Sequence, residues 1–269
     1  MNKKRVFNKI LKDIKNVKIQ GARNIAKQAL YAYSLFPTSS TKSKLLSLRP
    51  TEPMLINVLH RIENQSQEEI FSHFDKAQDK INEEVFKIIN NGDLIYTHCH
   101  STNVVQALIY AKKKDKNFSV YNTETRPLFQ GRKTAQELKK AGIPVTMFVD
   151  SAFDTIISGK KKVNKIFLGS DALLKKGIIN KIGSRTIAKL ARLKKVPVYV
   201  IADSWKYSPK QIKIEERDFH EIWNKIPKTS HIKIKNPAFE FVPRKYLRSI
   251  ISELGNLKYK EFLRKVRNN

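Results

Sequence analysis

Two side chains stand out for the chemistry that they could carry out: Cys99, the only cysteine of the chain, and Asp171. Cys99 follows the apolar run 94–97 and precedes a helix-like segment, where a helix N-terminus would lower the pKa of the thiol and favour its thiolate. Asp171 follows the apolar run 166–168, and partial burial at a strand end can hold the pKa of a carboxyl group near neutrality. A thiolate base and a carboxyl acid that face one pocket would form an acid–base pair.

Both residues also have a structural interpretation that the sequence leaves open. A free cysteine is commonly a packed core residue, and an aspartate after a strand commonly caps the next helix. A single cysteine cannot close an intramolecular disulfide, so Cys99 is expected to be a reduced thiol. The sequence thus assigns Cys99 either to packing or to chemistry, and Asp171 either to a helix cap or to acid–base catalysis.

His98 and His100 flank Cys99 and raise the question of a metal site. Alternation along an extended strand would place the two imidazoles on one side and the thiol on the other. The sequence shows no second cluster of histidine, cysteine or carboxylate residues to complete a four-ligand zinc site. We therefore expect no bound metal, and we interpret one histidine as a hydrogen-bonding wall of the pocket or as a structural residue.

Cationic segments near these positions suit a phosphorylated ligand. Asn180 and Lys181 precede a helix start, whose free backbone N–H groups would form a phosphate cradle. Arg126 carries a planar fork that suits a phosphate or a sugar hydroxyl edge. In the N-terminal part, Arg23 and Arg49 would bring further donors into the same cleft. For each arginine the alternative is a solvent-exposed salt bridge.

The elements that must position these residues fall into two parts. Up to about residue 92 the pattern is helical, and its clearest segment is 66–91, where Ser66 and Glu69 form a capping box. After Gly92, short β-rich runs alternate with helix-like stretches, which predicts a parallel sheet with helices on both faces. These runs are 94–97, 118–122, 144–149, 165–168 and 197–201.

The predicted fold is therefore α/β, with a helical N-terminal domain at residues 1–92 and a Rossmann-like, doubly wound catalytic domain at residues 93–269. Ligands of such sheets bind at the carboxyl ends of the strands. In this chain the predicted strand ends are polar, and Cys99, Arg126 and Asp171 follow three of them. The sequence therefore predicts that these side chains lie along one edge of the sheet.

Composition narrows the class of protein further. The chain has 269 residues, of which 41% are hydrophobic, and a formal net charge of +29. It contains no apolar run of about 18 residues, and its basic start lacks the features of a signal peptide, so we expect a cytoplasmic protein with no membrane partner. The lysines are spread along the chain without an aromatic-interleaved basic motif, which favours solvated basic faces over nucleic-acid binding.

Several motifs occur in an order that resembles one protein family. They are YTHCHSTNVV, YNTETRPLFQGRKTAQEL, GIPVTMFVDSA, FLGSDAL, NKIGS and NPAFEFVP. Residues 18–245 are similar to the family that unites archaeal ribose-1,5-bisphosphate isomerase, methylthioribose-1-phosphate isomerase and the α, β and δ subunits of eukaryotic initiation factor two-B. The motifs around Cys99 and Arg126 look most like those of ribose-1,5-bisphosphate isomerase.

The resemblance implies a function and a set of site residues. It implies an aldose–ketose isomerase that converts ribose 1,5-bisphosphate to ribulose 1,5-bisphosphate in AMP degradation, with Cys99 as proton acceptor and Asp171 as proton donor. It implies a phosphorylated sugar as substrate, no cofactor, and a homo-oligomer, either a dimer or a hexamer. The positions that match substrate-binding residues of the family are Gly21, Ala22, Arg23, Arg49, Arg126, Asn180, Lys181 and Lys206.

One departure from the family pattern keeps two other functions in view. Where the isomerases have Arg-Gly-Ala-Gly, this chain has Gln20 followed by Gly-Ala-Arg, so a phosphate-binding arginine is displaced or lost. Gln20 and the basic charge favour a non-catalytic regulatory subunit that acts in translation initiation, whereas Cys99 and Asp171 favour an enzyme. A methylthioribose-1-phosphate isomerase would use the same pair on a substrate with one phosphate.

Overall fold

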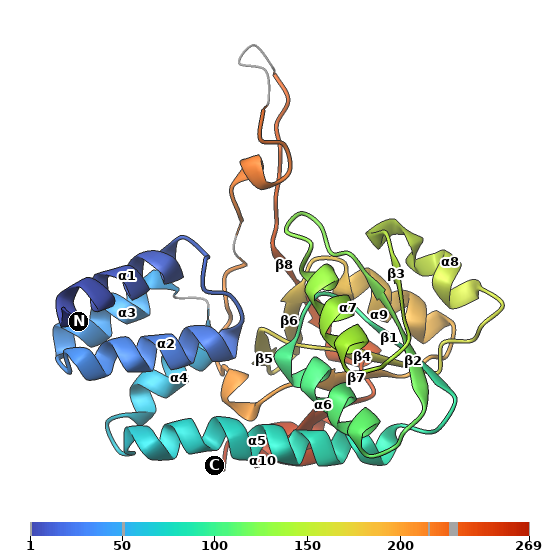
Figure 1. The fold of residues 1–269 in the computed structure, drawn as a ribbon, viewed down its shortest axis with the longest axis horizontal. Helices are drawn as coiled ribbons and strands as arrows, with labels where there is room; N and C mark the ends of the chain where they lie inside the picture. The colour runs from blue at the N-terminus through green and yellow to red at the C-terminus, as the bar shows by residue number, and fades with distance from the viewer. Residues whose placement is uncertain (1, 50–51, 215, 226–230, 269) are drawn as a thin grey trace.

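The computed structural model describes residues 2–49, 52–214, 216–225 and 231–268. Helices occupy the chain up to the first strand and form the blue and cyan part of Figure 1. Side-chain oxygens of Asn2, Thr38 and Ser66 accept backbone N–H groups at three of the helix starts, which satisfies donors that a helix cannot pair internally. The helices are α1 (Lys3–Lys15), α2 (Ala22–Leu35), α3 (Ser39–Leu48), α4 (Pro53–Arg61) and α5 (Gln67–Ile88).

Helix α5 connects this helical part to the rest of the molecule. It begins with the predicted capping box, because Ser66 and Glu69 each accept the backbone N–H of the other. Its first half packs Phe74 against α2, α4 and Trp205. Its second half packs Ile81 and Val85 against the main sheet. One apolar stripe therefore belongs to two cores.

The main sheet has the strand order β10-β9-β7-β4-β1-β2-β3, and its pairs are parallel except for β9 with β10. The five apolar runs predicted as strands are confirmed as β1, β2, β3, β4 and β7. The sequence did not predict β9 and β10. The strands are β1 (Asp93–Thr97), β2 (Phe118–Thr123), β3 (Val145–Phe148), β4 (Lys165–Leu168), β7 (Val198–Ile201), β9 (Ser249–Ser252) and β10 (Gly255–Leu257).

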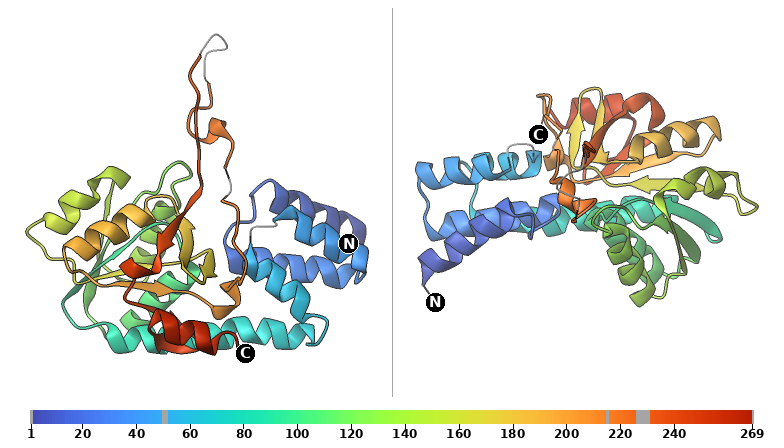
Figure 2. Two further views of the ribbon diagram at one scale, coloured as in Figure 1. Left: turned by 180° about the vertical axis from the view of Figure 1, so that it is seen from behind. Right: turned by 90° about the horizontal axis from the view of Figure 1, so that it is seen from above.

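Helices cover both faces of this sheet, as the predicted doubly wound fold requires (Figure 2). One face packs against α5, α6 (Thr102–Lys113) and α7 (Gln130–Lys140). The other packs against α8 (Phe153–Ser158), α9 (Ser184–Leu193) and α10 (Tyr259–Lys265). Alternate residues of β1 reach the two cores, with Ile95 on one face and Tyr96 on the other.

The chain reverses direction across the sheet at β1 and β4. After β1 it builds β2 and β3 on one side, and it then returns to place β4 on the other side of β1. In doubly wound sheets the strand ends at such a switch point diverge and leave a crevice for ligands. The crevice predicted from the sequence therefore lies after Thr97 and Leu168.

A small antiparallel sheet and a protruding segment were not predicted. The small sheet has the order β5-β6-β8 and contains β5 (Ala172–Leu174), β6 (Gly177–Lys181) and β8 (Phe239–Pro243). Residues 208–214, 216–225 and 231–238, here called the arm, project away from the body of the molecule between the helical part and the sheet (Figure 1). In the described part of the chain, no helix is both long enough and apolar enough to cross a membrane.

Candidate active site

A cavity of about 360 Å³ lies at the crevice between the ends of β1 and β4. The helical part contributes Gln20 and the residues after it, and the strand ends contribute residues around Cys99 and Asp171. Nine of the ten residues predicted as site residues are among the described residues that line it: Gly21, Ala22, Arg23, Arg49, Cys99, Asp171, Asn180, Lys181 and Lys206. The two predicted acid–base residues thus face one space.

Cys99 is held in an unusual backbone conformation at the bottom of this crevice. Its φ angle is 67°, a left-handed value that residues with a β-carbon rarely adopt and that costs conformational energy. Its N–H donates to Thr125 Oγ1 at 3.0 Å, and its carbonyl accepts the hydroxyl of Thr134 at 2.9 Å. Thr125 also has a left-handed φ, of 64°. The two threonine hydroxyls therefore hold the backbone of Cys99 in this conformation.

The expectation that a helix N-terminus favours the Cys99 thiolate is wrong, because the pKa of this thiol is raised. Burial, together with the carboxylates of Asp171 and Asp150, raises the pKa of Cys99 to about 11. The Lys181 ammonium acts in the opposite direction and lowers this pKa. Helix α6 begins only at Thr102, so burial outweighs its dipole. Cys99 is therefore a neutral thiol at neutral pH.

His98 and His100 line the same cavity as Cys99, so the predicted alternation of sides is also wrong. The left-handed turn at Cys99 interrupts the extended strand on which that alternation depends. His98 Nε2 donates to the carbonyl of Ile182 at 2.8 Å, and its Nδ1 accepts the Thr123 hydroxyl at 2.7 Å. Burial lowers the pKa of His98. His98 is thus a neutral wall of the pocket.

His100 is fixed from the other side of the turn. The Thr134 hydroxyl donates its hydrogen bond to the Cys99 carbonyl, so it can only accept from His100. His100 Nδ1 therefore donates to Thr134 Oγ1, at 3.1 Å. Burial, aided by the Lys133 charge, lowers the pKa of His100 to about 4. Both histidines are therefore uncharged near pH 7 and engaged by threonines.

Asp171 follows β4 and is half-buried. The alternative that it caps a helix is excluded, because the next element is strand β5. Its N–H donates to the carbonyl of Ile179 at 2.9 Å, and the preceding Ser170 hydroxyl donates to Ala172 O at 2.8 Å. These bonds anchor the turn to the small sheet. Asp171 is thereby held at the cavity, where its charge acts on both Cys99 and Lys206.

The cavity is rich in cations. Among its described lining residues, Glu52 and Asp171 are the carboxylates, and six side chains are cationic: Arg23, Arg49, Lys133, Lys181, Lys206 and Arg217. Arg23 Nη2 lies 2.5 Å from Asp75 Oδ1, and Arg49 Nη2 lies 3.4 Å from Glu52 Oε1. The excess of positive charge makes the cavity suited to a ligand with more than one negative charge.

Lys206 is one of the buried cations of the cavity, together with Arg49 and Lys181. Its Nζ donates to the carbonyl of Ser170 at 2.7 Å, and burial lowers its pKa against the opposing charges of Asp171, Asp203 and Glu52. A buried ammonium is costly unless it has anionic partners. A ligand phosphate in the cavity would supply one.

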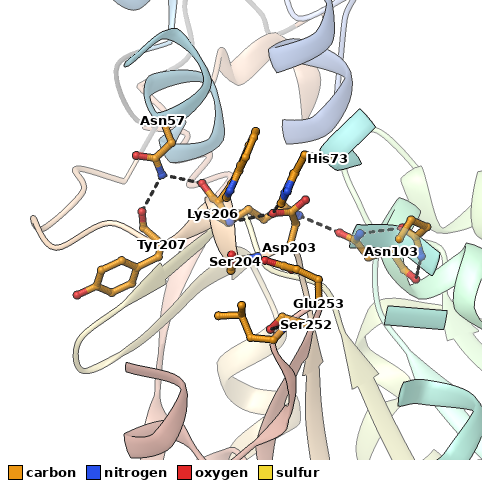
Figure 3. A network of polar contacts seen from close by, with 12 residues as sticks. Asn57, His73, Asn103, Asp203, Ser204, Lys206, Tyr207, Ser252 and Glu253 are labelled. Carbon is orange, nitrogen blue, oxygen red and sulfur yellow. Dashed lines mark hydrogen bonds and ion pairs between the residues drawn. The ribbon is translucent and has the colours of Figure 1, made fainter. Parts of the chain in front are cut away.

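A polar network holds the turn that contains Lys206 against the helical part (Figure 3). Asp203 Oδ1 accepts the N–H of Trp205 at 2.8 Å and lies 3.2 Å from His73 Nε2. The His73 ring stacks on Trp205, with centroids 3.5 Å apart. Asn57 of α4 donates to the carbonyls of Trp205 and Tyr207, at 2.7 and 2.9 Å. The 3-10 turn Ser204–Lys206 is thus fixed to two helices of the helical part.

The predicted phosphate cradle at residues 180–184 is only partly realised. Asn180 and Lys181 line the cavity, and both are buried. The helix start that follows them is not free, because the N–H of Arg185 donates to Glu240 Oε1 at 2.9 Å. A carboxylate of β8 therefore occupies the first turn of α9, and the two side chains rather than the helix terminus face a ligand.

Arg126 is the predicted site residue that is not among the described lining residues of the cavity. It is exposed, and its guanidinium lies 4.9 Å from the ring centroid of Phe129. Its backbone N–H donates to Asp150 Oδ2 at 2.7 Å. Its role in binding stays a prediction.

Sequence reasoning missed several residues of the cavity. Arg217 and Phe239 enter it from the arm and from β8, which no periodicity connected with the crevice. Lys133 and Gln130 enter it from the start of α7. The motifs that contain Gln130, Lys133 and Phe239 were recognised, but as signs of the family rather than as parts of the site. Arg217 had no signal of its own.

One group of side chains in the described residues has the types and spacing to hold a cation. It consists of His73, Asp203 and Glu253, whose ligand atoms lie within 4.8 Å of one another. His73 and Asp203 contact each other directly, and Asp203 and Glu253 accept the N–H groups of Trp205 and Ser204. These contacts account for the cluster as part of the network around Lys206 (Figure 3).

The fold and this site define a doubly wound α/β protein with a cation-rich cavity at its switch point, and comparison with known proteins gives the family. The description "Initiation factor 2 subunit family" belongs to the profile that matches residues 38–259. A relative from Methanocaldococcus jannaschii, named ribose 1,5-bisphosphate isomerase, is 34% identical over 95% of this chain and 92% of its own length. The chain therefore belongs to the initiation factor 2 subunit family.

Two further relatives show the range of this family. One from Exiguobacterium sibiricum, named methylthioribose-1-phosphate isomerase, is 31% identical over 81% of this chain and 72% of its own. The solved structure of Pyrococcus horikoshii translation initiation factor eIF-2B matches with a TM-score of 0.82 and 25% identity, over 94% of this chain and 96% of that one. These matches confirm the predicted family and fold class, and the named isomerases confirm the expectation of an isomerase.

Proposed function

We propose that this protein converts ribose 1,5-bisphosphate to ribulose 1,5-bisphosphate, as a step of AMP degradation. The observation that carries the proposal is the placement of Cys99 and Asp171 at the ends of the two switch-point strands, in one cavity where the described cationic side chains outnumber the carboxylates. Two relatives are named as isomerases of a sugar phosphate, which agrees with this chemistry.

The reaction needs one acid and one base that each return to their starting form. The protonated Asp171 gives its proton to the ring oxygen, which breaks the bond from that oxygen to C1 and leaves a cation at C1. The Cys99 thiolate removes the C2 proton, and the electron pair of that C–H bond forms the C1–C2 double bond of an enol. Asp171 then takes the proton of the C2 hydroxyl while Cys99 returns its proton to C1. The product is an isomer of the substrate, and both side chains are restored.

The resting protonation states fit this scheme if the two residues act as a coupled pair. Burial keeps the Cys99 pKa at about 11, so the thiol is neutral near pH 7. The reactive form, a thiolate with a protonated Asp171, differs from a thiol with an ionised Asp171 only by transfer of one proton. Neutralising Asp171 removes one of the charges that raise the Cys99 pKa. Protonation of Asp171 therefore favours the Cys99 thiolate that the scheme requires.

The cations of the cavity have a definite role in this reaction. A sugar bisphosphate carries two phosphate groups, and cations are needed to offset the cost of removing these charges from water and bringing them into one cavity. Lys206 and Lys181 are both buried at the strand-end side of the cavity, whereas Arg23 and Arg49 come from the helical part. Cations on opposite walls suit a ligand with a charge at each end.

The test is to incubate the purified protein with ribose 1,5-bisphosphate and to follow ribulose 1,5-bisphosphate, alongside Cys99→Ser and Asp171→Asn. Each variant is expected to lose about 10²- to 10⁴-fold in kcat, the usual contribution of a general acid or base. Both variants should still bind the substrate, as measured by calorimetry. No turnover by the wild type, or a fully active Cys99→Ser, would reject the proposal.

A non-catalytic role in translation initiation is the second candidate, and Gln20 is the observation that favours it. Gln20 lines the cavity at the position where the resemblance leads one to expect a phosphate-binding arginine. Under this alternative the protein would bind a sugar phosphate or a nucleotide without turning it over. Gln20→Arg distinguishes the two, because it should tighten binding in either case but alter turnover only in an enzyme.

A further inference from the structure

Among its described residues, the arm carries one cationic side chain into the cavity, that of Arg217. This side chain is only 8% exposed, although it belongs to a segment that projects from the body of the molecule. A buried guanidinium on a protruding segment needs specific partners, because desolvation of a charge is costly. Its surroundings therefore indicate what it is placed to do.

A single carboxylate orients the guanidinium. Arg217 Nε and Nη2 both donate to Glu221 Oε1, at 3.0 and 2.7 Å. Within the described part of the chain, Nη1 donates no hydrogen bond, so one edge of the planar group is held and another is open. A planar guanidinium with a free edge can bind a phosphate through parallel N–H groups.

The partner carboxylate is itself fixed. The amide of Asn236, which is buried, donates to Glu221 Oε2 at 3.2 Å and to the carbonyl of Asp218 at 2.9 Å. The backbone N–H of Arg217 donates to the carbonyl of Asn236 at 2.9 Å, which joins the two sides of the arm at its base. Arg217, Glu221 and Asn236 therefore form a preorganised unit rather than a flexible surface ion pair.

We propose that Arg217 binds a phosphate group of the cavity's ligand, and that Glu221 and Asn236 are positioning residues that aim its open edge. Arg23 and Arg49 share this arrangement, since each guanidinium contacts a carboxylate while its residue lines the cavity. The inference rests on the proposed function in that it takes the ligand to be a sugar phosphate. It goes beyond that function by assigning a binding residue to the arm.

A consequence is that the binding site is complete only with the contribution of Arg217. The helical part and the strand ends supply cations on two walls, and the arm supplies Arg217 as a third contribution. Loss of Arg217 should then weaken binding while leaving the acid–base pair in place. This separates its effect from those of Cys99 and Asp171.

The experiment compares Arg217→Gln with Lys235→Gln, which removes one positive charge from the same arm at a side chain that is 77% exposed and does not line the cavity. Kd is measured by calorimetry for ribose 1,5-bisphosphate and for inorganic phosphate. Arg217→Gln is expected to raise Kd roughly 10- to 100-fold, the loss of a charge-assisted hydrogen-bonded contact. Lys235→Gln should change Kd less than about twofold.

Turnover of ribose 1,5-bisphosphate supplies a second readout. Arg217→Gln is expected to raise KM with little change in kcat, which a general loss of structure would not produce. If the wild type turns over the substrate and Arg217→Gln has the same Kd and KM as the wild type, the inference is overturned and the proposed function stands. If the wild type shows no turnover but binds phosphate through Arg217, the function is rejected and the inference stands.

A third variant guards against misfolding. Arg217→Lys keeps the positive charge but loses the planar fork that both Glu221 and a phosphate require. It is expected to raise Kd severalfold with an unchanged thermal midpoint in the absence of ligand. Wild-type affinity in Arg217→Lys, or a wild-type protein that binds neither probe, would overturn the assignment.

Discussion

Gly169 and Ser101 approach each other so closely that a β-carbon at position 169 would lie 2.6 Å from Ser101 Cβ and 2.7 Å from its Oγ. Gly169 lies two residues before Asp171, and Ser101 lies two residues after Cys99. The contact therefore sets the separation of the two turns that carry the proposed acid and base. It requires the absence of a side chain at position 169.

Gly169→Ala is expected to push these turns apart and to lower kcat by about 10²-fold, because a displacement near 1 Å is enough to disrupt a reacting geometry. The variant should remain folded, since the movement is confined to two turns. Steady-state kinetics and the thermal midpoint measure both effects. The paired variant Gly169→Ala with Ser101→Gly removes the clashing β-carbon and should recover much of the loss. A paired variant no better than Gly169→Ala alone would contradict this interpretation.

The pKa of Cys99 is expected to respond in opposite directions to its two neighbours. Asp171→Asn removes a charge that raises this pKa, and Lys181→Gln removes one that lowers it. The thiolate should therefore form at lower pH in Asp171→Asn and at higher pH in Lys181→Gln than the wild-type value of about 11. Because the chain has one cysteine, the pH dependence of alkylation by iodoacetamide reports this group alone.

Cys99→Ser supplies the blank for that measurement. Asp171→Asn should then combine faster alkylation at pH 8 with loss of turnover, a combination that distinguishes a broken acid–base pair from an unfolded site. Shifts in the same direction for both variants would show that the charges of Asp171 and Lys181 do not control the thiol.

Stability at acid pH is expected to depend on His100. Its pKa is lowered from 6.5 to about 4 in the folded protein, so between these values the unfolded chain binds a proton that the folded chain does not. The stability that neutral His100 contributes is present in full above pH 6.5 and is lost as the pH falls toward 4. A shift of this size corresponds to at most roughly 3 kcal/mol.

His100→Gln keeps a hydrogen-bonding side chain that does not titrate. Urea unfolding at pH 7, 5.5 and 4.5 should show a smaller loss of unfolding free energy for this variant than for the wild type. Some pH dependence should remain, because burial also lowers the pKa of His98. An equal loss in both proteins would assign the acid sensitivity to other groups.

Asn57 is expected to stabilise the contact between the helical part and the Lys206 turn. Asn57→Ala leaves the carbonyls of Trp205 and Tyr207 without this donor and should cost about 1–3 kcal/mol of unfolding free energy. Asn64→Ala, at an exposed position, is the matched control and should have little effect. Urea titrations measure both, and equal midpoints for the two variants would argue against a role for Asn57.

Local patterns predicted the elements that depend on neighbouring residues. The capping box at Ser66 and the five parallel strands are visible as short-range spacing, and both occur in the structure. Strand order places Cys99 and Asp171 at adjacent strand ends, which general rules for parallel sheets allow one to anticipate. The sequence therefore predicted which residues follow the strands at the carboxyl edge of the sheet.

Effects that arise from burial and long-range contacts could not be predicted in this way. The raised pKa of Cys99 comes from desolvation in the folded crevice, which opposes the local effect of the helix that follows. The occupation of the α9 start by Glu240 depends on β8, which pairs with β6 across the arm. Arg217 likewise reaches the cavity only because the arm returns to the body of the molecule.

The shared helix α5 has a consequence for how such a chain can be inherited and recombined. Its Phe74 belongs to the core of the helical part, and its Ile81 and Val85 belong to the core of the sheet. A genetic exchange with its boundary after α5 would remove the sheet residues against which the second half of this helix packs. An exchange with its boundary before α5 would remove the helical residues against which the first half packs. The helical part and the sheet are therefore expected to be passed on together, with new substrate preferences arising by substitution along the cavity rather than by exchange of modules.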